Sequence, residues 1–297
     1  MSLSAFRPPP PAVPNILLSL PSPHVLLVTL NRPRQLNAIP IAQHAAMTAL
    51  WAWYDAQPQL RCAVLTGNGR AFCAGADLRE WDADHRPLPD SRGGDGDGDG
   101  QADRAEEEGR KIWVRDGGFG GLSNRAGKKP VVAAVNGLCF GGGMEMVVNC
   151  DLVVADGERA RFGLPEVTKG VVALAGALPR LVRTVGRQRA AEMALLGRTE
   201  YTAREMREWG LVNFVAGVGE AVGDAVRLAE EIARNSPDAV IVSREGLRLG
   251  WEGMGPELGT EVLGKGMYGR IDGGENMREG VRSFVERREP VWTDSKL

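Results

Sequence analysis

The sequence is poor in the side chains on which much metal-dependent and nucleophilic catalysis depends. It contains three histidines and four cysteines in 297 residues, and no two cysteines have C-x-x-C spacing. We therefore expect no metal site and no disulfide framework, and a reducing compartment is the default for such a chain. None of the histidines stands beside a plausible nucleophile and base in the sequence, which disfavours histidine-driven catalysis.

The chain also lacks an excess of charge and a long apolar run. Its formal net charge is -2, which indicates neither a basic surface for nucleic acid nor an acidic solvating tail. No apolar run approaches about 18 residues, so we expect no membrane span. With 43% hydrophobic and 25% charged residues, the composition is that of a globular protein with one large domain, or a core and a smaller domain.

Both ends of the chain carry signals of their own. Residues 1–23 are rich in proline and lack the apolar segment of a secretory signal, so we expect an extended leader. The last three residues, Ser295, Lys296 and Leu297, form the tripeptide that acts as a peroxisomal address when it is free at a C-terminus. This predicts a peroxisomal location and an import receptor as a partner; a chance match is the alternative.

Short apolar segments alternate with helical or loop segments through much of the chain. Residues 41–54 have the apolar spacing of a helix. Four apolar segments bounded by turn signals are typical of buried strands: 24–30, 61–66, 131–135 and 151–155. The pattern predicts an α/β core with crossover connections over residues 24–215, and a helical region over 216–297 that packs on the core or on another subunit.

Residues 82–110 interrupt this pattern with a glycine- and aspartate-rich segment that is nearly free of apolar residues. Such a composition cannot bury a core, and we expect a flexible surface insertion. A calcium loop is the alternative, because acidic residues recur there with EF-hand spacing. The matching residues are Asp95, Asp97, Asp99, Gly100 and Glu106. The preceding residues cannot form the entering helix, which favours the flexible loop.

One stretch combines a strand, a glycine triplet and a carboxylate. The apolar run of residues 131–135 is followed by Gly141, Gly142 and Gly143, and then by Glu145 among methionines and valines. Glycines let a backbone approach a ligand closely and direct its N–H groups at it. A glutamate in apolar surroundings is costly to ionise, so it has either a partner or a functional pKa.

A second small-residue loop, residues 73–77, follows a different predicted strand. If the two loops are adjacent, they offer two backbone N–H groups to one oxygen, which is the geometry of an oxyanion hole. The alternative is that each loop is simply a tight turn.

Glu166 is a second carboxylate in an apolar setting. It follows Pro165, so it could also be an ordinary glutamate in the first turn of a helix. Two such carboxylates beside an oxyanion hole suit proton transfer at the carbon next to a carbonyl group.

Several motifs in a fixed order resemble the crotonase, or enoyl-CoA hydratase/isomerase, superfamily, and the resemblance covers residues 24–292. The matching segments are NRPRQLNAI at 31–39, AFCAGADL at 71–78, VNGLCFGGGMEMVVNCDLVVA at 135–155, ARFGLPEV at 160–167, GLVNFV at 210–215 and MREGVRSFVERREPVW at 277–292. The resemblance implies an α/β fold with a crotonase-like spiral of repeated ββα units. It also implies a helical C-terminal oligomerisation region that forms a homotrimer or hexamer.

The resemblance also implies roles for individual residues. The amides of Ala76 and Gly142 would form the oxyanion hole for the thioester of an acyl-CoA. Glu145 would help activate water for attack at Cβ, and Glu166 would deliver the proton to Cα. Further positions match the family's contacts to coenzyme A: Ala38, Ala74, Asp77, Leu78 and Arg79. Coenzyme A is part of the substrate, and no separate cofactor is expected.

The chain departs from many hydratases after Glu166. Residues 170–181 read GVVALAGALPRL, where many hydratases have a glycine-rich segment of the kind GTIPGAGGTQRL. This segment borders the acyl and water site, so the acyl group stays open. Hydration of a 2-enoyl-CoA is the predicted reaction, with two alternatives: an enoyl-CoA isomerase that needs one glutamate, and a non-catalytic acyl-CoA-binding protein.

Overall fold

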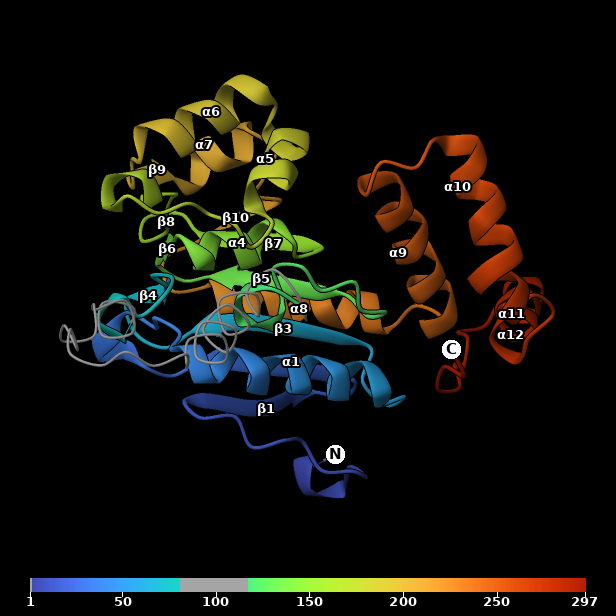
Figure 1. Cartoon of the computed structure of the whole chain (residues 1–297). Helices are drawn as coiled ribbons and strands as arrows, with labels where there is room; N and C mark the ends of the chain where they lie inside the picture. The colour runs from blue at the N-terminus through green and yellow to red at the C-terminus, as the bar shows by residue number, and fades with distance from the viewer. Residues whose placement is uncertain (1, 81–116) are drawn as a thin grey trace, which may run out of the picture.

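The computed structural model describes residues 2–80 and 117–297, which form two sheets with helices around them (Figure 1). The predicted insertion and its calcium alternative lie outside the described residues. The larger sheet has six strands in the order β1-β2-β3-β5-β7-β10. Their bounds are β1 Ile16–Ser22, β2 Val25–Leu30, β3 Cys62–Gly67, β5 Val131–Val135, β7 Leu152–Asp156 and β10 Phe214–Ala216. The mixed α/β architecture confirms the predicted fold class.

The central strands of the larger sheet were visible in the sequence because they are buried on both faces. β2, β3, β5, β7 and β10 are parallel, and every residue of β3 and β5 is buried. Parallel strands covered on both faces are continuous apolar runs, the pattern on which the four predicted strands were based. All four are present, with bounds that differ by at most one residue.

The expected leader is wrong in part, because residues 16–22 form an edge strand of the same sheet. β1 pairs antiparallel with β2, with Ile16 opposite Leu30 and Ser19 opposite Leu27. Its residues alternate between half-buried and exposed, as expected for a strand with one face to solvent. Pro21 lies in this strand, and proline is tolerated at a sheet edge because no neighbour needs its missing N–H. The core therefore begins before residue 24.

The smaller sheet has four short strands, and it carries the glycine loops. Its strand order is β4-β6-β8-β9. The bounds are β4 Ala71–Cys73, β6 Leu138–Phe140, β8 Arg161–Gly163 and β9 Tyr201–Thr202. Strands of two or three residues are too short for an alternation pattern to be recognised, so the sequence did not predict them.

Helices cover both faces of the larger sheet. Leu65 of β3 packs in the cluster that includes Trp51 of α1 (Ile41–Ala56), whereas the neighbouring Val64 packs in the cluster of α8 (Ala221–Ala233). Small residues of α8, such as Ala225 and Ala229, are completely buried against the strands. The core therefore extends past residue 216, which is a correction to the predicted boundary.

The remaining helices follow the smaller sheet or form the C-terminal group. They are α4 Gly142–Val148, α5 Ala177–Val185, α6 Arg187–Leu196, α7 Ala203–Glu208, α9 Pro237–Trp251, α10 Pro256–Leu263, α11 Gly269–Ile271 and α12 Glu275–Glu286. Short helical turns are η1 Leu3–Ala5, η2 Pro33–Gln35, η3 Phe119–Gly121, η4 Glu166–Lys169 and the π-helical η5 Gly264–Tyr268. In Figure 1, α9 to α12 stand at one side of the core. None of the described helices is long and apolar enough to cross a membrane.

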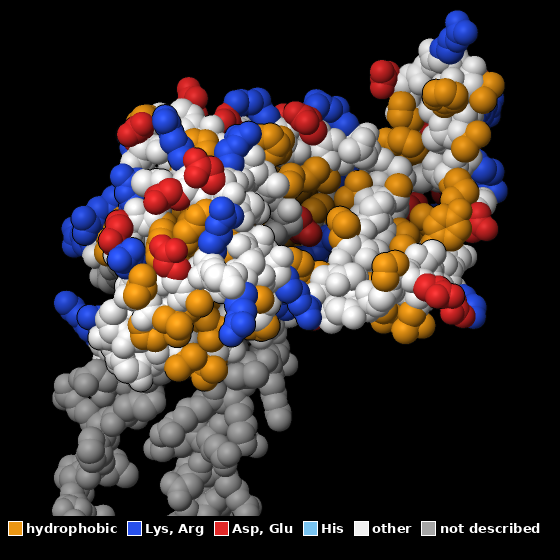
Figure 2. Space-filling view, turned by 90° about the horizontal axis from the view of Figure 1, so that it is seen from above, with side chains coloured by type: hydrophobic (Ala, Val, Ile, Leu, Met, Phe, Trp, Pro, Cys, Tyr) orange, Lys and Arg blue, Asp and Glu red, His pale blue; other side chains and the backbone are white. Residues whose placement is uncertain are grey.

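The C-terminal helices expose large hydrophobic side chains (Figure 2). Leu247 is 76% exposed, Phe284 83% and Val285 73%. Apolar surface of this kind is a common mark of a contact with another molecule.

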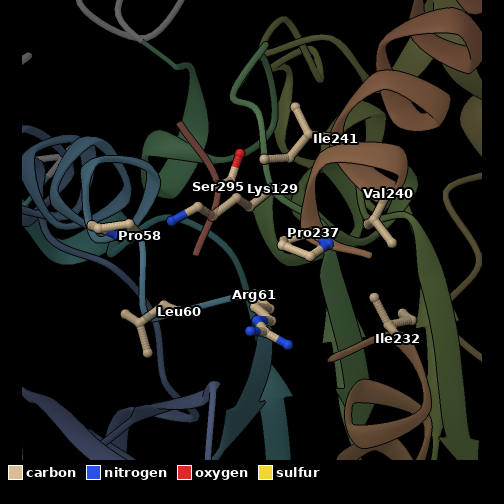
Figure 3. A pocket seen from close by; sticks show the side chains of 9 residues that line it. All are labelled: Pro58, Leu60, Arg61, Lys129, Ile232, Pro237, Val240, Ile241 and Ser295. Carbon is tan, nitrogen blue, oxygen red and sulfur yellow. The ribbon is translucent and has the colours of Figure 1, made fainter. Parts of the chain in front are cut away.

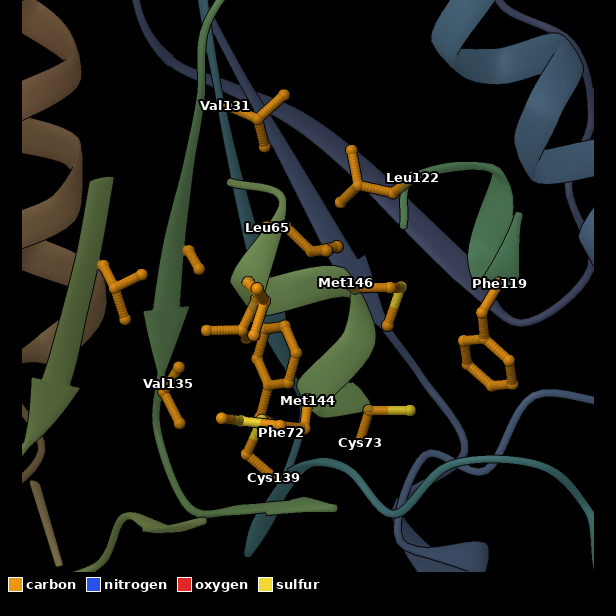
Figure 4. Close-up of a cluster of buried hydrophobic side chains, with 14 of the residues drawn as sticks. Leu65, Phe72, Cys73, Phe119, Leu122, Val131, Val135, Cys139, Met144 and Met146 are labelled. Atoms are coloured by element: carbon orange, nitrogen blue, oxygen red, sulfur yellow. The ribbon is translucent and has the colours of Figure 1, made fainter. Parts of the chain in front are cut away.

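Helix α4 is anchored in the main hydrophobic core (Figure 4). All its residues are buried, and Met144 and Met146 belong to the same cluster as Leu65, Phe72 and Val135. Because this packing fixes the helix axis and rotation, the residues of its first turn are held in place. Glu145 is one of them.

Candidate active site

The two glycine loops meet at one edge of the smaller sheet. β4 and β6 are parallel neighbours, so the loops that follow them leave the sheet at the same edge. A Cβ atom at Gly75 would lie 3.2 Å from the amide nitrogen of Gly142, and Gly75 has a φ of 97°. Glycine is therefore required here by both the close approach and the backbone conformation.

The amides of Ala76 and Gly142 are left available by the local backbone geometry. Ile39 donates to the carbonyl of Gly75 (2.9 Å) and accepts from the amide of Asp77 (3.3 Å). Because successive N–H groups of a strand point to opposite sides, the N–H of Ala76 points away from Ile39. Gly142 is the first residue of α4, where amides have no acceptor within the helix. Neither N–H donates a hydrogen bond to any residue that the structure describes.

Glu145 lies in the first turn of α4 and is 4% exposed. One of its carboxylate oxygens, Oε1, accepts from the amides of Ala175 (2.8 Å) and Ala177 (3.4 Å). These amides belong to the turn before and at the start of α5, within the segment where the sequence departs from many hydratases. The turn of residues 175–177 therefore determines the position of the carboxylate.

Glu166 approaches the same loops from another direction. It begins the short helical turn η4 after Pro165, which is the helix-entry position that the sequence left open as an alternative. A Cβ atom at Gly141 would lie 3.2 Å from its Oε1, while its buried Oε2 has no hydrogen-bond partner among the described residues. The structure thus brings Glu145 and Glu166 to opposite ends of the Gly141–Glu145 turn.

Both carboxyl groups hold protons more tightly than free glutamates. Burial raises the pKa of Glu145 to about 7, and the negative charge of Glu166 contributes to the rise. Burial also raises the pKa of Glu166. The amides of Ala175 and Ala177 stabilise the ionised form of Glu145 and limit its shift. Near neutral pH, therefore, the two carboxyl groups titrate as a coupled pair that shares a proton.

The other residues that the sequence singled out form one surface beside the first loop. Arg32, which the sequence did not identify, joins two of them, because it donates to the carbonyl of Ala38 (2.7 Å) and pairs with Asp77 (3.0 Å). Ala74 is held in the same place by an amide hydrogen bond to Leu36 (3.0 Å). Leu78 and Arg79 are exposed at the end of this described stretch.

Phe119 of η3 and Ser123, which follows this turn, also lie at the site. Neither was predicted from the sequence. A Cβ atom at Gly142 would lie 2.4 Å from the ring of Phe119, so this ring packs directly on the second loop. The hydroxyl of Ser123 connects Phe119 to the turn that holds Glu145. Their one sequence signal is the glycine-rich run of residues 117–121, which indicates an unusual backbone.

Two cysteines lie on the strands that carry the loops. Cys73 ends β4 and accepts from the amide of Gly75 at 3.4 Å, and Cys139 lies in β6. Both are fully buried. Burial raises the pKa of Cys73 to about 12 and that of Cys139 well above its usual value. Both side chains are therefore thiols at neutral pH.

The C-terminal tripeptide lies against the C-terminal helices rather than at the two loops. The hydroxyl of Ser295 donates to Asp238 of α9 at 2.5 Å, and Lys296 pairs with Glu275 of α12 at 2.9 Å. Lys128 donates to the carbonyl oxygen of Leu297 at 2.7 Å.

Beside Ser295 is a small pocket between the core and α9 (Figure 3). Its walls include Arg61, Lys129, Pro237 and Ile241. Its volume of about 10 Å³ has room for roughly one water molecule, so it is not a substrate site.

Comparisons with known proteins identify the family of the chain. The family model described as enoyl-CoA hydratase/isomerase matches residues 22–92 and 122–295. A mevalonyl-coenzyme A hydratase of Beauveria bassiana is 58% identical over 98% of this chain and 99% of its own length. A protein of the same name from Aspergillus fumigatus is 47% identical over 97% of this chain and 98% of its own length.

A solved structure agrees with the sequence comparison. The crystal structure of an enoyl-CoA hydratase from Mycobacterium tuberculosis H37Rv superposes with a TM-score of 0.79 at 31% identity, covering 95% of this chain and all (100%) of that one. The chain belongs to the enoyl-CoA hydratase/isomerase family, within the crotonase superfamily.

Proposed function

We propose that this protein catalyses the reversible addition of water across the Cα–Cβ double bond of an acyl-CoA thioester. The observation that carries the proposal is the juxtaposition of two available amides, on Ala76 and Gly142, with two carboxyl groups of raised pKa, on Glu145 and Glu166. Hydration needs a stabilised enolate, one proton acceptor and one proton donor, and this set of groups supplies all three.

The amides would act on the thioester oxygen. When the proton on Cα is removed, or when water attacks Cβ, negative charge develops on that oxygen. Two N–H groups already directed at it stabilise the charge without reorganisation, and a single such donor is worth roughly 3–4 kcal/mol in other enzymes. Ala76 and Gly142 are held for this role by the Ile39 bridge and by the N-terminus of α4.

The two glutamates would divide the proton transfers. In dehydration, ionised Glu166 takes the proton from Cα, and protonated Glu145 gives a proton to the departing hydroxyl group on Cβ. In hydration the same steps run backwards, so that Glu145 activates the water and Glu166 delivers the proton to Cα. Dehydration therefore starts from the singly protonated pair with the proton on Glu145, and hydration from the pair with the proton on Glu166.

We further propose a mevalonyl-type substrate, a branched acyl group with a methyl and a hydroxyl on Cβ and a second, terminal hydroxyl. The support is the identity of 58% and 47% to two mevalonyl-coenzyme A hydratases over nearly the whole chain. Residues 170–181, where the sequence departs from many hydratases, include the two amides that donate to Glu145. A different acyl group would be accommodated at this segment.

An assay with two substrates tests the proposal. The purified chain is incubated with mevalonyl-CoA and with straight-chain 3-hydroxybutyryl-CoA, and the absorbance of the conjugated enoyl thioester is followed. We expect kcat/KM to be higher for mevalonyl-CoA by about 10-fold or more. Equal values would contradict the substrate. In water enriched in heavy oxygen, label must enter the β-hydroxyl; turnover without label would indicate an isomerase, and binding without turnover a non-catalytic protein.

The dependence of the rate on pH follows from the shared proton. Above about pH 7, Glu145 loses its proton and the pair becomes doubly ionised, so kcat/KM should fall. At low pH Glu166 is protonated as well, and kcat/KM should fall again. The expected profile is therefore bell-shaped, measured as kcat/KM between about pH 4 and 9. A rate that stays flat through pH 7 to 9 would contradict the assignment of the donor.

We propose a peroxisomal location through Ser295, Lys296 and Leu297, read by an import receptor. Deleting the three residues should leave a fluorescently tagged protein in the cytosol, and unchanged import would contradict the proposal. We also propose a homotrimer or hexamer, supported by the exposed hydrophobic side chains of α9 and α12. Light scattering that gives a monomer mass would exclude it.

A further inference from the structure

The turn that holds Glu145 is itself held by a buried serine. Ser123 is completely buried, and its hydroxyl donates to the carbonyl of Ala175 at 2.7 Å. Ala175 is also the residue whose amide donates to Glu145 at 2.8 Å. The serine hydroxyl and the glutamate carboxylate therefore bind the two sides of one residue.

The same hydroxyl also binds the opposite side of the site. Its oxygen accepts from the amide of Phe119 at 2.7 Å. The ring of Phe119 packs directly on Gly142, whose amide is one of the two proposed donors to the substrate oxygen. One hydroxyl thus joins the segment that packs on Gly142 to the turn that holds Glu145.

An arginine of α5 supports this junction from its other side. Arg180 donates through Nη1 to the carbonyl of Ser123 (2.9 Å), to Oδ1 of Asn124 (2.6 Å) and to the carbonyl of Gly176 (3.4 Å). Gly176 lies between the two residues whose amides bind Glu145. The turn is therefore linked to the Ser123 segment through both a hydroxyl and a guanidinium group.

We propose that Ser123 is a positioning residue, whose buried hydroxyl fixes the position of the Glu145 carboxylate relative to the Gly142 amide. The inference rests on the hydratase function proposed above and adds to it a residue whose hydroxyl binds backbone groups of Phe119 and Ala175. Proton transfer to Cβ and charge stabilisation at the thioester oxygen must act on one substrate at once. A small displacement between the two groups lowers the rate even when each group is intact.

The variant Ser123→Ala tests the proposal, because it removes the hydroxyl with almost no change in volume. Phe119 then loses an acceptor and the Ala175 carbonyl loses a donor, so the turn is free to move relative to η3. We expect kcat to fall by about 10- to 100-fold while KM stays within about 3-fold. The matched control is Ser283→Ala, which removes another buried hydroxyl, bound to Gly280 of α12 (3.0 Å), and should leave kcat unchanged.

A readout without substrate separates this inference from the hydratase proposal. The amides of the turn stabilise ionised Glu145, so loosening them raises its pKa. Infrared titration of the carboxyl groups, assigned with Glu145→Gln, should show this pKa higher by about half a unit or more in Ser123→Ala. If the wild-type protein has no hydratase activity but the shift occurs, the hydratase proposal fails and the positioning of Glu145 stands.

A second variant keeps the proposal testable if Ser123→Ala does not fold. Arg180→Lys keeps the charge but cannot hold three acceptors with one planar group, and it should lower kcat and raise the pKa of Glu145 in the same direction. Thermal unfolding identifies variants that fail to fold. If folded Ser123→Ala has the kcat and the Glu145 pKa of the wild type, the proposal is overturned.

Discussion

Replacing Glu145 or Glu166 by glutamine is expected to lower kcat by about 10³-fold or more, because a glutamine side chain can neither give nor take the proton. Glutamine has the shape of glutamate, and at position 145 its carbonyl oxygen can still accept from the amides of Ala175 and Ala177. The fold should therefore survive. Steady-state rates at saturating substrate give the effect.

The two replacements together distinguish the reaction types. A hydratase needs a donor and an acceptor, so each single variant should be severely impaired, whereas an isomerase with one proton shuttle would tolerate one of them. The control is Glu231→Gln on the exposed face of α8, which should keep the wild-type rate. Full activity of either Glu145→Gln or Glu166→Gln would refute the assignment.

Replacing Gly142 by alanine should cost about 10²- to 10³-fold in kcat. The new methyl group would lie 2.4 Å from the ring of Phe119, a distance that real Cβ atoms do not tolerate, so the ring or the N-terminus of α4 must move. Either movement disturbs the amide that is proposed to bind the thioester oxygen. Rapid-quench or absorbance assays of kcat would measure the loss.

A matched glycine provides the control for this substitution. Gly250 lies in α9, and a Cβ atom there would have no heavy atom within 4 Å apart from its chain neighbours and the backbone of its own helix; its φ is not positive. Gly250→Ala should therefore leave the rate unchanged and stabilise the helix slightly. If folded Gly142→Ala retains the wild-type kcat, this amide does not act on the reacting oxygen.

Local patterns in the sequence were sufficient to predict strands that are buried on both faces, because such strands consist of continuous apolar residues. β3 and β5 are buried on both faces and were predicted from continuous apolar runs, whereas β1 was hidden by Pro21 and by a half-exposed alternation. Helix α8 shows a second limit of local patterns. Its helical period was visible, but whether Ala225 packs on the sheet depends on tertiary contacts that no local pattern contains.

The candidate site was predictable to the extent that its residues are chemically unusual in their sequence surroundings. Glu145 and Glu166 stood out as carboxylates among apolar residues, and the family resemblance placed Ala76 and Gly142 beside them. Ser123 had no such signal, because a serine in a glycine-rich segment is ordinary. Its importance comes from two hydrogen bonds to residues four and 52 positions away in the chain.

The buried cysteines have a consequence for the chemistry proposed here. The dehydrated product, an enoyl thioester, is a Michael acceptor, and a thiolate beside it would add to Cβ and inactivate the protein. Cys73 and Cys139 flank the loops, yet burial raises the pKa of Cys73 to about 12 and that of Cys139 well above its usual value. Because the thiolate is the nucleophile, such thiols are inert, and the protein is protected against alkylation by its own product.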